Sequence, residues 1–185
     1  DEENDRPRTA FFVRQGAMGT KRILITGGAG FIGSNAARYF GMRNWRVTVL
    51  DNLSRAGAGK NLTWLREDMS FDFEQVDVRD QANIERVFSA GRFEAVLHLA
   101  AQVAVTTSVT DPRTDFAVNA FGTFNVLDAV RIHCPEAVFI LASTNKVYGK
   151  IAGAATVLAG NRYAYADRVH GIAETEPLDF LSPFE

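Results

Sequence analysis

The chain has 185 residues, of which 46% are hydrophobic and 23% charged, a composition typical of a globular domain with a substantial core. The formal net charge is -2, so no basic surplus indicates nucleic-acid binding. A single cysteine, Cys134, excludes an internal disulfide framework and is expected to be a small packing residue. No apolar run approaches the ~18 residues of a membrane span and nothing resembles a signal peptide, so we expect a cytoplasmic protein.

The first 20 residues differ in pattern from the rest of the chain. They are polar at first and then show no clear period. We therefore expect residues 1–20 to be an extension outside the fold, disordered by default, and residues 21–185 to form one domain.

An apolar run over residues 23–25 leads into a glycine cluster and then into a helical pattern over residues 34–40. The glycines are Gly27, Gly30 and Gly33. Gly27 can take a tight turn, Gly30 lets a pyrophosphate approach the backbone, and Gly33 lets the helix pack closely. The first turn of the helix offers free N–H groups to phosphates. This pattern predicts a dinucleotide site.

A second apolar run, residues 46–50, ends at Asp51, about 20 residues beyond the glycine turn. A carboxylate at this position can accept both hydroxyls of an adenosine ribose and repels a 2′-phosphate. The pattern therefore favours NAD over NADP. Arg55 lies nearby in the sequence and favours NADP instead, so that alternative stays open.

Predicted strands alternate with predicted helices along the chain. The strands cover residues 22–26, 46–50, 71–76, 95–99 and 137–142. Helices are predicted to begin near Ser34, near Asn61, after Asp80 and at Pro112, and the last of them runs to His133. Asn61 and Asp80 are expected to cap their helices. Residues 100–110 and 150–185 are predicted to be mostly loop. Such alternation requires right-handed crossovers between parallel strands, hence an α/β doubly wound (Rossmann) sheet of order 3-2-1-4-5. Its site lies beyond the carboxyl ends of the strands.

Several motifs in order resemble the extended short-chain dehydrogenase/reductase family, whose members act on nucleotide sugars. They are TGGAGFIGS at 26–34, DNLSR at 51–55, DVRD at 77–80, HLAAQ at 98–102, NAFGTFNVLDA at 119–129 and STNKVYG at 143–149. Within the family, STNKVYG, QVAVTTS at 102–108 and the stretch 162–183 resemble the CDP-tyvelose (CDP-paratose) 2-epimerase branch. The resemblance covers residues 21–183, the N-terminal part of such enzymes, and implies a role in O-antigen biosynthesis of lipopolysaccharide.

The resemblance also assigns roles to individual residues. NAD-binding residues by this resemblance are Gly27, Gly30, Phe31, Ile32 and Gly33 for the pyrophosphate; Asp51, Asn52, Ser54 and Arg55 around the ribose; Asp77 and Val78 at the adenine; and Ala100, Ala101, Gln102 and Asn119 at the nicotinamide half. Thr144 matches the residue that hydrogen-bonds the reacting sugar hydroxyl, with Asn145 beside the substrate. No metal site is expected, and related enzymes dimerise through the helix matching residues 112–133.

Structural alternatives stay open for several of these residues. Asp77 is also placed to cap the next segment, Asn119 to satisfy backbone groups, and Thr144 to form a turn. His98 lies in an apolar strand, which favours a packed core histidine. Lys146 and Tyr148 are expected to be a solvated loop residue and a packing residue.

The family takes its catalytic base from a Tyr-x-x-x-Lys motif, in which the lysine lowers the pKa of the phenol. Phe184 stands at the tyrosine position, and no lysine follows before Glu185. We therefore expect an inactive N-terminal fragment of a nucleotide-sugar epimerase, cut before the last strands and the substrate domain, that binds NAD weakly at best.

Two alternatives remain from the sequence. One is a catalytically dead NAD-binding module. The other is a 4-epimerase or 4,6-dehydratase of another nucleotide sugar, although dehydratases place acidic residues beside the catalytic threonine, where this chain has Asn145 and Lys146.

Overall fold

The computed structural model of the chain describes residues 20–149, 151, 153–168 and 170–179. These residues form two compact units, which are described separately. The first contains residues 20–101 and 117–142, and the second contains residues 102–116 and the described residues from 143 onward. The expected N-terminal extension, apart from Thr20, lies outside the described residues.

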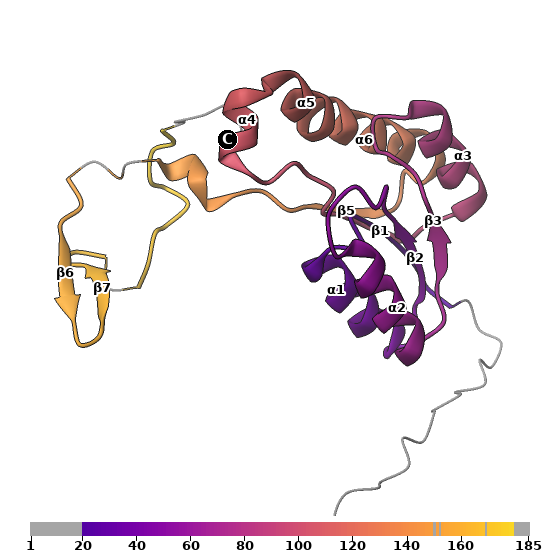
Figure 1. The fold of residues 1–185 in the computed structure, drawn as a ribbon, viewed down its shortest axis with the longest axis horizontal. Helices are drawn as coiled ribbons and strands as arrows, with labels where there is room; N and C mark the ends of the chain where they lie inside the picture. The colour runs from indigo at the N-terminus through magenta and orange to yellow at the C-terminus, as the bar shows by residue number, and fades with distance from the viewer. Residues whose placement is uncertain (1–19, 150, 152, 169, 180–185) are drawn as a thin grey trace, which may run out of the picture. The chain divides into compact units, whose positions relative to one another are not determined.

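The first unit is built on a five-stranded parallel sheet of order β3-β2-β1-β4-β5, as the sequence predicts (Figure 1). Its strands are β1 (Arg22–Thr26), β2 (Arg46–Leu50), β3 (Asp72–Glu74), β4 (Ala95–His98) and β5 (Val138–Leu141). The register pairs Thr26 with Leu50 on one side and with His98 on the other. The residues that directly follow these three strands therefore emerge at one edge of the sheet.

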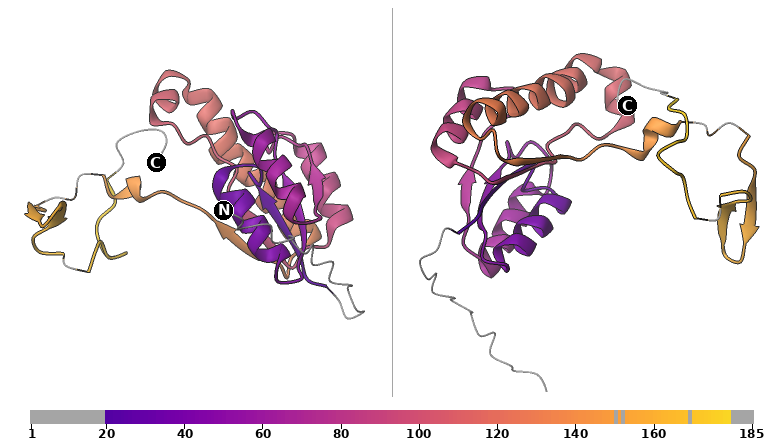
Figure 2. Two further views of the ribbon diagram at one scale, coloured as in Figure 1. Left: turned by 60° about the horizontal axis from the view of Figure 1, so that its bottom comes forward. Right: turned by 180° about the vertical axis from the view of Figure 1, so that it is seen from behind.

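Helices cover both faces of this sheet (Figures 1 and 2). The helices α1 (Phe31–Gly41) and α2 (Ala58–Asp68) cover one face, and α3 (Gln81–Gly91) and α6 (Gly122–His133) cover the other. Alternate residues of a strand point to opposite faces, so Ile23 and Ile25 pack beneath α1 and α2 while Leu24 joins the core beneath α3 and α6. Burial on both faces explains why β1 and β2 are almost continuously apolar.

The predicted helix caps were right at one helix and wrong at another. Asp80 caps α3, since its carboxylate accepts a hydrogen bond from the N–H of Asn83 at 3.2 Å. Asn61 does not cap α2, which begins at Ala58 after Gly57. Its side chain instead donates to the carbonyl oxygen of Ala29 at 2.8 Å. Asn61 therefore braces the glycine turn from the neighbouring helix.

The helix predicted over residues 112–133 is divided into three elements. These are α5 (Pro112–Phe116), a π-helical turn η1 (Ala117–Phe121), and α6. At the boundary, the hydroxyl of Thr123 donates to the carbonyl oxygen of Asn119 at 2.6 Å. Gly122 follows the π turn where an added Cβ would come within 2.6 Å of a Val78 methyl group. Such π turns widen a helix locally and are frequent at functional sites.

The second unit holds elements that the sequence analysis missed. Residues 100–110 were predicted as loop but contain α4 (Val105–Thr110), and the stretch after residue 150 contains an antiparallel hairpin of β6 (Thr156–Ala159) and β7 (Arg162–Tyr165). A 3-10 turn, η2 (Asn145–Tyr148), lies between them in the sequence. No helix in the described ranges is long and apolar enough to cross a membrane.

Candidate functional site at the carboxyl ends of the strands

The glycine turn after β1 has a backbone that side chains could not follow. Gly27 has φ +64°, and a Cβ there would lie 2.7 Å from the backbone nitrogen of Ala100. A Cβ on Gly33 would overlap the carbonyl oxygen of Gly27 and lie 2.6 Å from the Cα of Gly28. The predicted tight turn is thus confirmed, and Gly33 allows α1 to pack against the turn itself.

The N-terminus of α1 opens from this turn. No side chain caps the helix, whose N-cap residue is Gly30. The first N–H groups of a helix have no partner within it, so those of Phe31 and Ile32 are available to a ligand. The side chains of both residues point into solvent, with 81% and 67% of their surface exposed. Free N–H groups together with the positive end of a helix suit phosphate oxygens.

Asp51, directly after β2, lies beside the glycine turn. One carboxylate oxygen accepts the N–H of Ala29 at 3.0 Å, and the other accepts the N–H of Leu53 at 2.8 Å. Each oxygen of a carboxylate has a second lone pair, so Asp51 can still accept two hydroxyl groups. The structure therefore brings together the two features that the sequence predicts for a dinucleotide site, namely the glycine turn and a neighbouring carboxylate.

The loop after β3 is tied to the loop after β2 through Asp77. Its carboxylate pairs with Arg79 at 2.8 Å and accepts the side-chain amide of Asn52 at 2.8 Å. The hydrogen bond from Arg79, and then those from its backbone and from Asn52, hold the pKa of Asp77 well below its usual range despite partial burial. Asp77 also accepts the N–H of Arg79 at 3.0 Å, so the alternative expected for it, capping the segment that follows, is confirmed.

The other adenosine-side residues surround this pair of loops. The N–H of Ser54 donates to the side chain of Asn52 at 3.0 Å, and Arg55 is exposed. Val78 is buried, and its carbonyl oxygen accepts the side-chain amide of Asn125 from α6 at 2.9 Å. A negatively charged Asp77 and a fixed Asn52 therefore stand at the edge where the sequence places the adenosine.

His98, at the end of β4, is a core histidine, as predicted, and only 1% of its surface is exposed. Its Nδ1 lies 2.6 Å from the hydroxyl of Thr26, and its Nε2 lies 3.0 Å from the hydroxyl of Thr123. Burial lowers the pKa of His98 from 6.5 to about 4. The imidazole is therefore neutral at physiological pH.

This shift predicts a pH-dependent stability. The unfolded chain takes up a proton at His98 near pH 6.5, while the folded chain resists it down to about pH 4. The contribution of His98 is therefore complete above pH 6.5 and is lost progressively toward pH 4, by about 3 kcal/mol in total. Urea unfolding at pH 7 and at pH 4.5 measures this loss, and a His98→Gln variant should lose less stability over the same interval.

Three predicted site residues belong to the second unit. The side chain of Gln102 closes its own loop, donating to the carbonyl oxygen of Ala104 and accepting its N–H, both at 2.8 Å. Thr144 accepts the N–H of Lys146 at 3.1 Å and so caps η2, which confirms its turn-forming role. Asn145 begins η2, but its side chain lies outside the described part of the chain, as does the whole of Phe184. A sugar-binding role for Thr144 and Asn145 stays a prediction.

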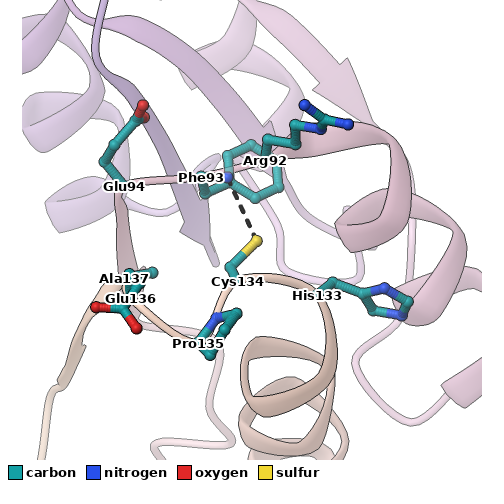
Figure 3. Close-up of a pocket in the computed structure, with 8 residues that line it drawn as sticks. All are labelled: Arg92, Phe93, Glu94, His133, Cys134, Pro135, Glu136 and Ala137. Atoms are coloured by element: carbon teal, nitrogen blue, oxygen red, sulfur yellow. Dashed lines mark hydrogen bonds between the residues drawn. The ribbon is translucent and has the colours of Figure 1, made fainter.

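A depression lies at the opposite ends of the strands, before β4 and β5 (Figure 3). Its lining includes Phe93 and Cys134, and the Cys134 sulfur accepts the N–H of Phe93 at 3.4 Å. Cys134 is buried in the core beneath α6, so the prediction of a small packing residue is confirmed. None of the residues predicted to bind a nucleotide lines this depression.

Comparison with known proteins gives a consistent set of relatives. The family model described as GDP-mannose 4,6 dehydratase matches residues 24–159. CDP-paratose 2-epimerase of Salmonella typhi is 40% identical over 163 residues, 88% of this chain and 48% of the relative. A dTDP-glucose 4,6-dehydratase of Neisseria meningitidis serogroup B is 39% identical over 143 residues, 72% of this chain and 40% of the relative.

Solved structures with the same fold include epimerases as well. The UDP-Glc/GlcNAc 4-epimerase of Campylobacter jejuni matches with a TM-score of 0.74 and 29% identity, over 89% of this chain and 44% of that one. The UDP-glucose 4-epimerase of Thermus thermophilus, solved in complex with NAD, matches with a TM-score of 0.66 and 38% identity, over 88% and 46%. The chain spans less than half the length of each of these four relatives.

Proposed function

This chain belongs to the family described as GDP-mannose 4,6 dehydratase, and from that premise we propose that it is the NAD-binding part of a nucleotide-sugar epimerase. The observation that carries the proposal is the hydrogen bond between the Asp51 carboxylate and the N–H of Ala29 at 3.0 Å. This hydrogen bond places the carboxylate that would bind the ribose next to the glycine turn, whose backbone a pyrophosphate can approach closely.

The residues present fit NAD at its adenosine end. The N–H groups at the start of α1 would bind the pyrophosphate, and Asp51 would accept the ribose hydroxyls. Asp77 and Asn52 would hold the adenine, and Ala100, Ala101 and Asn119 the nicotinamide half. The carboxylate of Asp51 would repel the 2′-phosphate of NADP, which supports NAD as the cofactor. Arg55, being exposed, is free to turn away from a ribose that carries no phosphate.

The chemistry divides between cofactor and chain. NAD, when bound, would supply the hydride acceptor and donor that inverting a sugar carbon requires. Thr144 would hydrogen-bond the reacting hydroxyl, and Asn145 would contact the sugar. The family's base is a tyrosine, and phenylalanine at position 184 has no proton to exchange, so the chain itself lacks that base. Loss of a general base typically lowers the rate by ~10²–10⁴.

For the substrate we propose a CDP-sugar that is epimerised at C2, in the cytoplasm and in the service of O-antigen synthesis. The match to CDP-paratose 2-epimerase supports this, since it covers 88% of the chain, whereas the match to the Neisseria dehydratase covers 72%. The 4-epimerase alternative is supported by the structural relatives, which act at C4 by their names.

Proton NMR of sugar nucleotides incubated with the protein and NAD separates these alternatives. Because phenylalanine stands at the tyrosine position, we expect saturable NAD binding without turnover of either sugar. Inversion at C2 of CDP-paratose would contradict the missing base and support the CDP-sugar, whereas inversion at C4 of UDP-glucose without change at C2 would contradict the CDP-sugar. Absence of NAD binding contradicts the proposal as a whole.

We also propose that the protein forms a homodimer through the segment predicted as a helix over residues 112–133, which includes η1 and α6. Phe121, Phe124 and Leu127 recur at the spacing of one helix face, and each remains at least 42% exposed. A Phe124→Arg substitution should therefore shift sedimentation from dimer to monomer, and the monomer should still unfold in one cooperative transition, at a somewhat lower midpoint because association no longer stabilises it. Its matched control is Arg131→Ala on the same helix, which should leave the dimer intact. A wild-type monomer at high concentration contradicts the proposal.

A further inference from the structure

Thr26, His98 and Thr123 form one chain of hydrogen bonds whose direction can be assigned. Thr123 has a single hydroxyl proton, and it donates this proton to the carbonyl oxygen of Asn119 at 2.6 Å. Toward His98 the Thr123 oxygen can then only accept, so the Nε2 atom of the imidazole carries the proton. A neutral imidazole with its proton on Nε2 has a lone pair on Nδ1. The hydroxyl of Thr26, at 2.6 Å, donates to it.

The Thr26 oxygen completes the chain at the loop after β4. Its two lone pairs accept the N–H groups of Leu99 and Ala100, each at 3.2 Å. A hydroxyl offers one proton and two lone pairs, so every bonding position of Thr26 is used. The histidine proton therefore determines which way the Thr26 hydroxyl points, and through it how the backbone of Ala100 is held.

The loop held in this way touches the glycine turn directly. The space beside Gly27 is filled by the backbone of Ala100, where a Cβ would come within 2.7 Å of its nitrogen. Thr26 itself immediately precedes Gly27. At its other end the chain of bonds reaches Asn119, in the π turn before α6. One buried imidazole thus links β1, β4 and η1 at the edge of the sheet that carries the candidate site.

We propose that His98 is a positioning residue, held as its neutral Nε2–H tautomer between Thr123 and Thr26, that fixes the Ala100 loop against the glycine turn for the nicotinamide half of the cofactor. The part of this inference that concerns NAD rests on the proposed function. The tautomer and its effect on the loop do not. A histidine that only fills space would not require one tautomer or transmit a change from Thr123 to Ala100.

Nitrogen-detected NMR of the full chain, labelled with ¹⁵N-histidine, tests the tautomer directly. The expected spectrum shows His98 with its proton on Nε2 throughout pH 6–8. A proton on Nδ1, a mixture of tautomers, or titration near pH 6.5 overturns the proposal.

A matched pair of variants tests the transmission. Thr123→Val removes the acceptor of the Nε2–H, which drives the proton to Nδ1 and leaves the Thr26 oxygen with three donors for two lone pairs. Amide hydrogen exchange at Ala100 should then speed up about tenfold, the effect of one lost hydrogen bond. Exchange at Val96, within β4, should not change. Thr123→Ser keeps the hydroxyl and should behave like the wild type. Equal acceleration at Val96 and Ala100 overturns the proposal in favour of general loosening.

Binding of NAD and of AMP to the same variants tests the functional part. Thr123→Val should weaken NAD on the order of fivefold, because the loop is no longer preorganised, and leave AMP unchanged because AMP occupies only the adenosine end. Equal weakening of both ligands overturns the positioning role. If the wild type binds neither ligand while the tautomer and exchange results hold, the proposed function fails and the linkage through His98 stands.

Discussion

Replacing Gly33 by alanine is expected to destabilise the fold by about 2 kcal/mol and to abolish NAD binding. The added methyl group would overlap the carbonyl oxygen of Gly27 and the Cα of Gly28. Both are backbone atoms and cannot rotate away as a side chain can, so the turn or the helix must shift. The cost of such overpacking, about 1–3 kcal/mol or more, exceeds the ~1 kcal/mol that alanine gains over glycine within a helix. Urea unfolding and calorimetric titration with NAD measure the two effects.

Gly59→Ala is the matched control. Gly59 also lies inside a helix, α2, but a Cβ there would meet no atom within 4 Å. Alanine should therefore stabilise the chain by up to ~1 kcal/mol and leave NAD binding unchanged. Equal stabilisation by both substitutions would mean that α1 does not pack closely on the turn, contrary to the structure.

Asp51→Asn is expected to lower the affinity for NAD about 100-fold, since hydrogen bonds to a charged group contribute about 1.5–3 kcal/mol each. The asparagine NH2 group would also face the N–H of Ala29 or of Leu53, both of which now donate to the carboxylate. NADP should lose less, because the charge that repels its 2′-phosphate has gone. The ratio of NAD to NADP affinity in calorimetry therefore reports on Asp51 itself.

Asp72→Asn provides the control for this charge change. Asp72 begins β3 and pairs with Arg46 at 2.9 Å, at the opposite ends of the strands from Asp51. Both side chains are about half exposed, so the pair contributes little. The substitution should leave NAD affinity unchanged. An equal loss in both variants would point to overall charge rather than to a ribose contact.

Local patterns were sufficient for the sheet and the adenosine end of the site. The bounds of β1 and β2 were predicted to the residue, because buried parallel strands are apolar throughout and end at marked turns. The neighbourhood of Asp51 and the glycine turn also followed from sequence, since adjacent parallel strands deliver their following residues to one edge.

The helix α4 and the hairpin of β6 and β7 were not predicted from the sequence. The sequence of α4, VTTSVT, is rich in β-branched residues, which lose rotamer freedom in helices. The helix is accompanied by hydroxyl-to-carbonyl bonds, such as that from Ser108 to Val105 at 2.7 Å. The hairpin of β6 and β7 did carry a local signal, since Gly160 and Asn161 separate two runs of alternating residues. That signal was overlooked in a stretch that otherwise resembles loop.

The bonds around His98 could not be predicted from spacing. Thr26 and His98 lie 72 positions apart, and His98 and Thr123 lie 25 apart. Their meeting depends on the register of β1 with β4 and on where the π turn ends. Sequence alone identified a buried histidine but not its partners, because hydrogen-bond direction follows from three-dimensional contacts.

The most direct test is a titration of the ¹⁵N-labelled chain with NAD, followed by amide NMR. We predict saturable shifts at residues 27–33 and 51–55, strongest in the first turn of α1, and the same shifts with AMP at residues 51–55. Saturable shifts confined to residues 92–94 and 133–137, or no shifts at millimolar NAD, would contradict a nucleotide site at the carboxyl ends of β1 and β2.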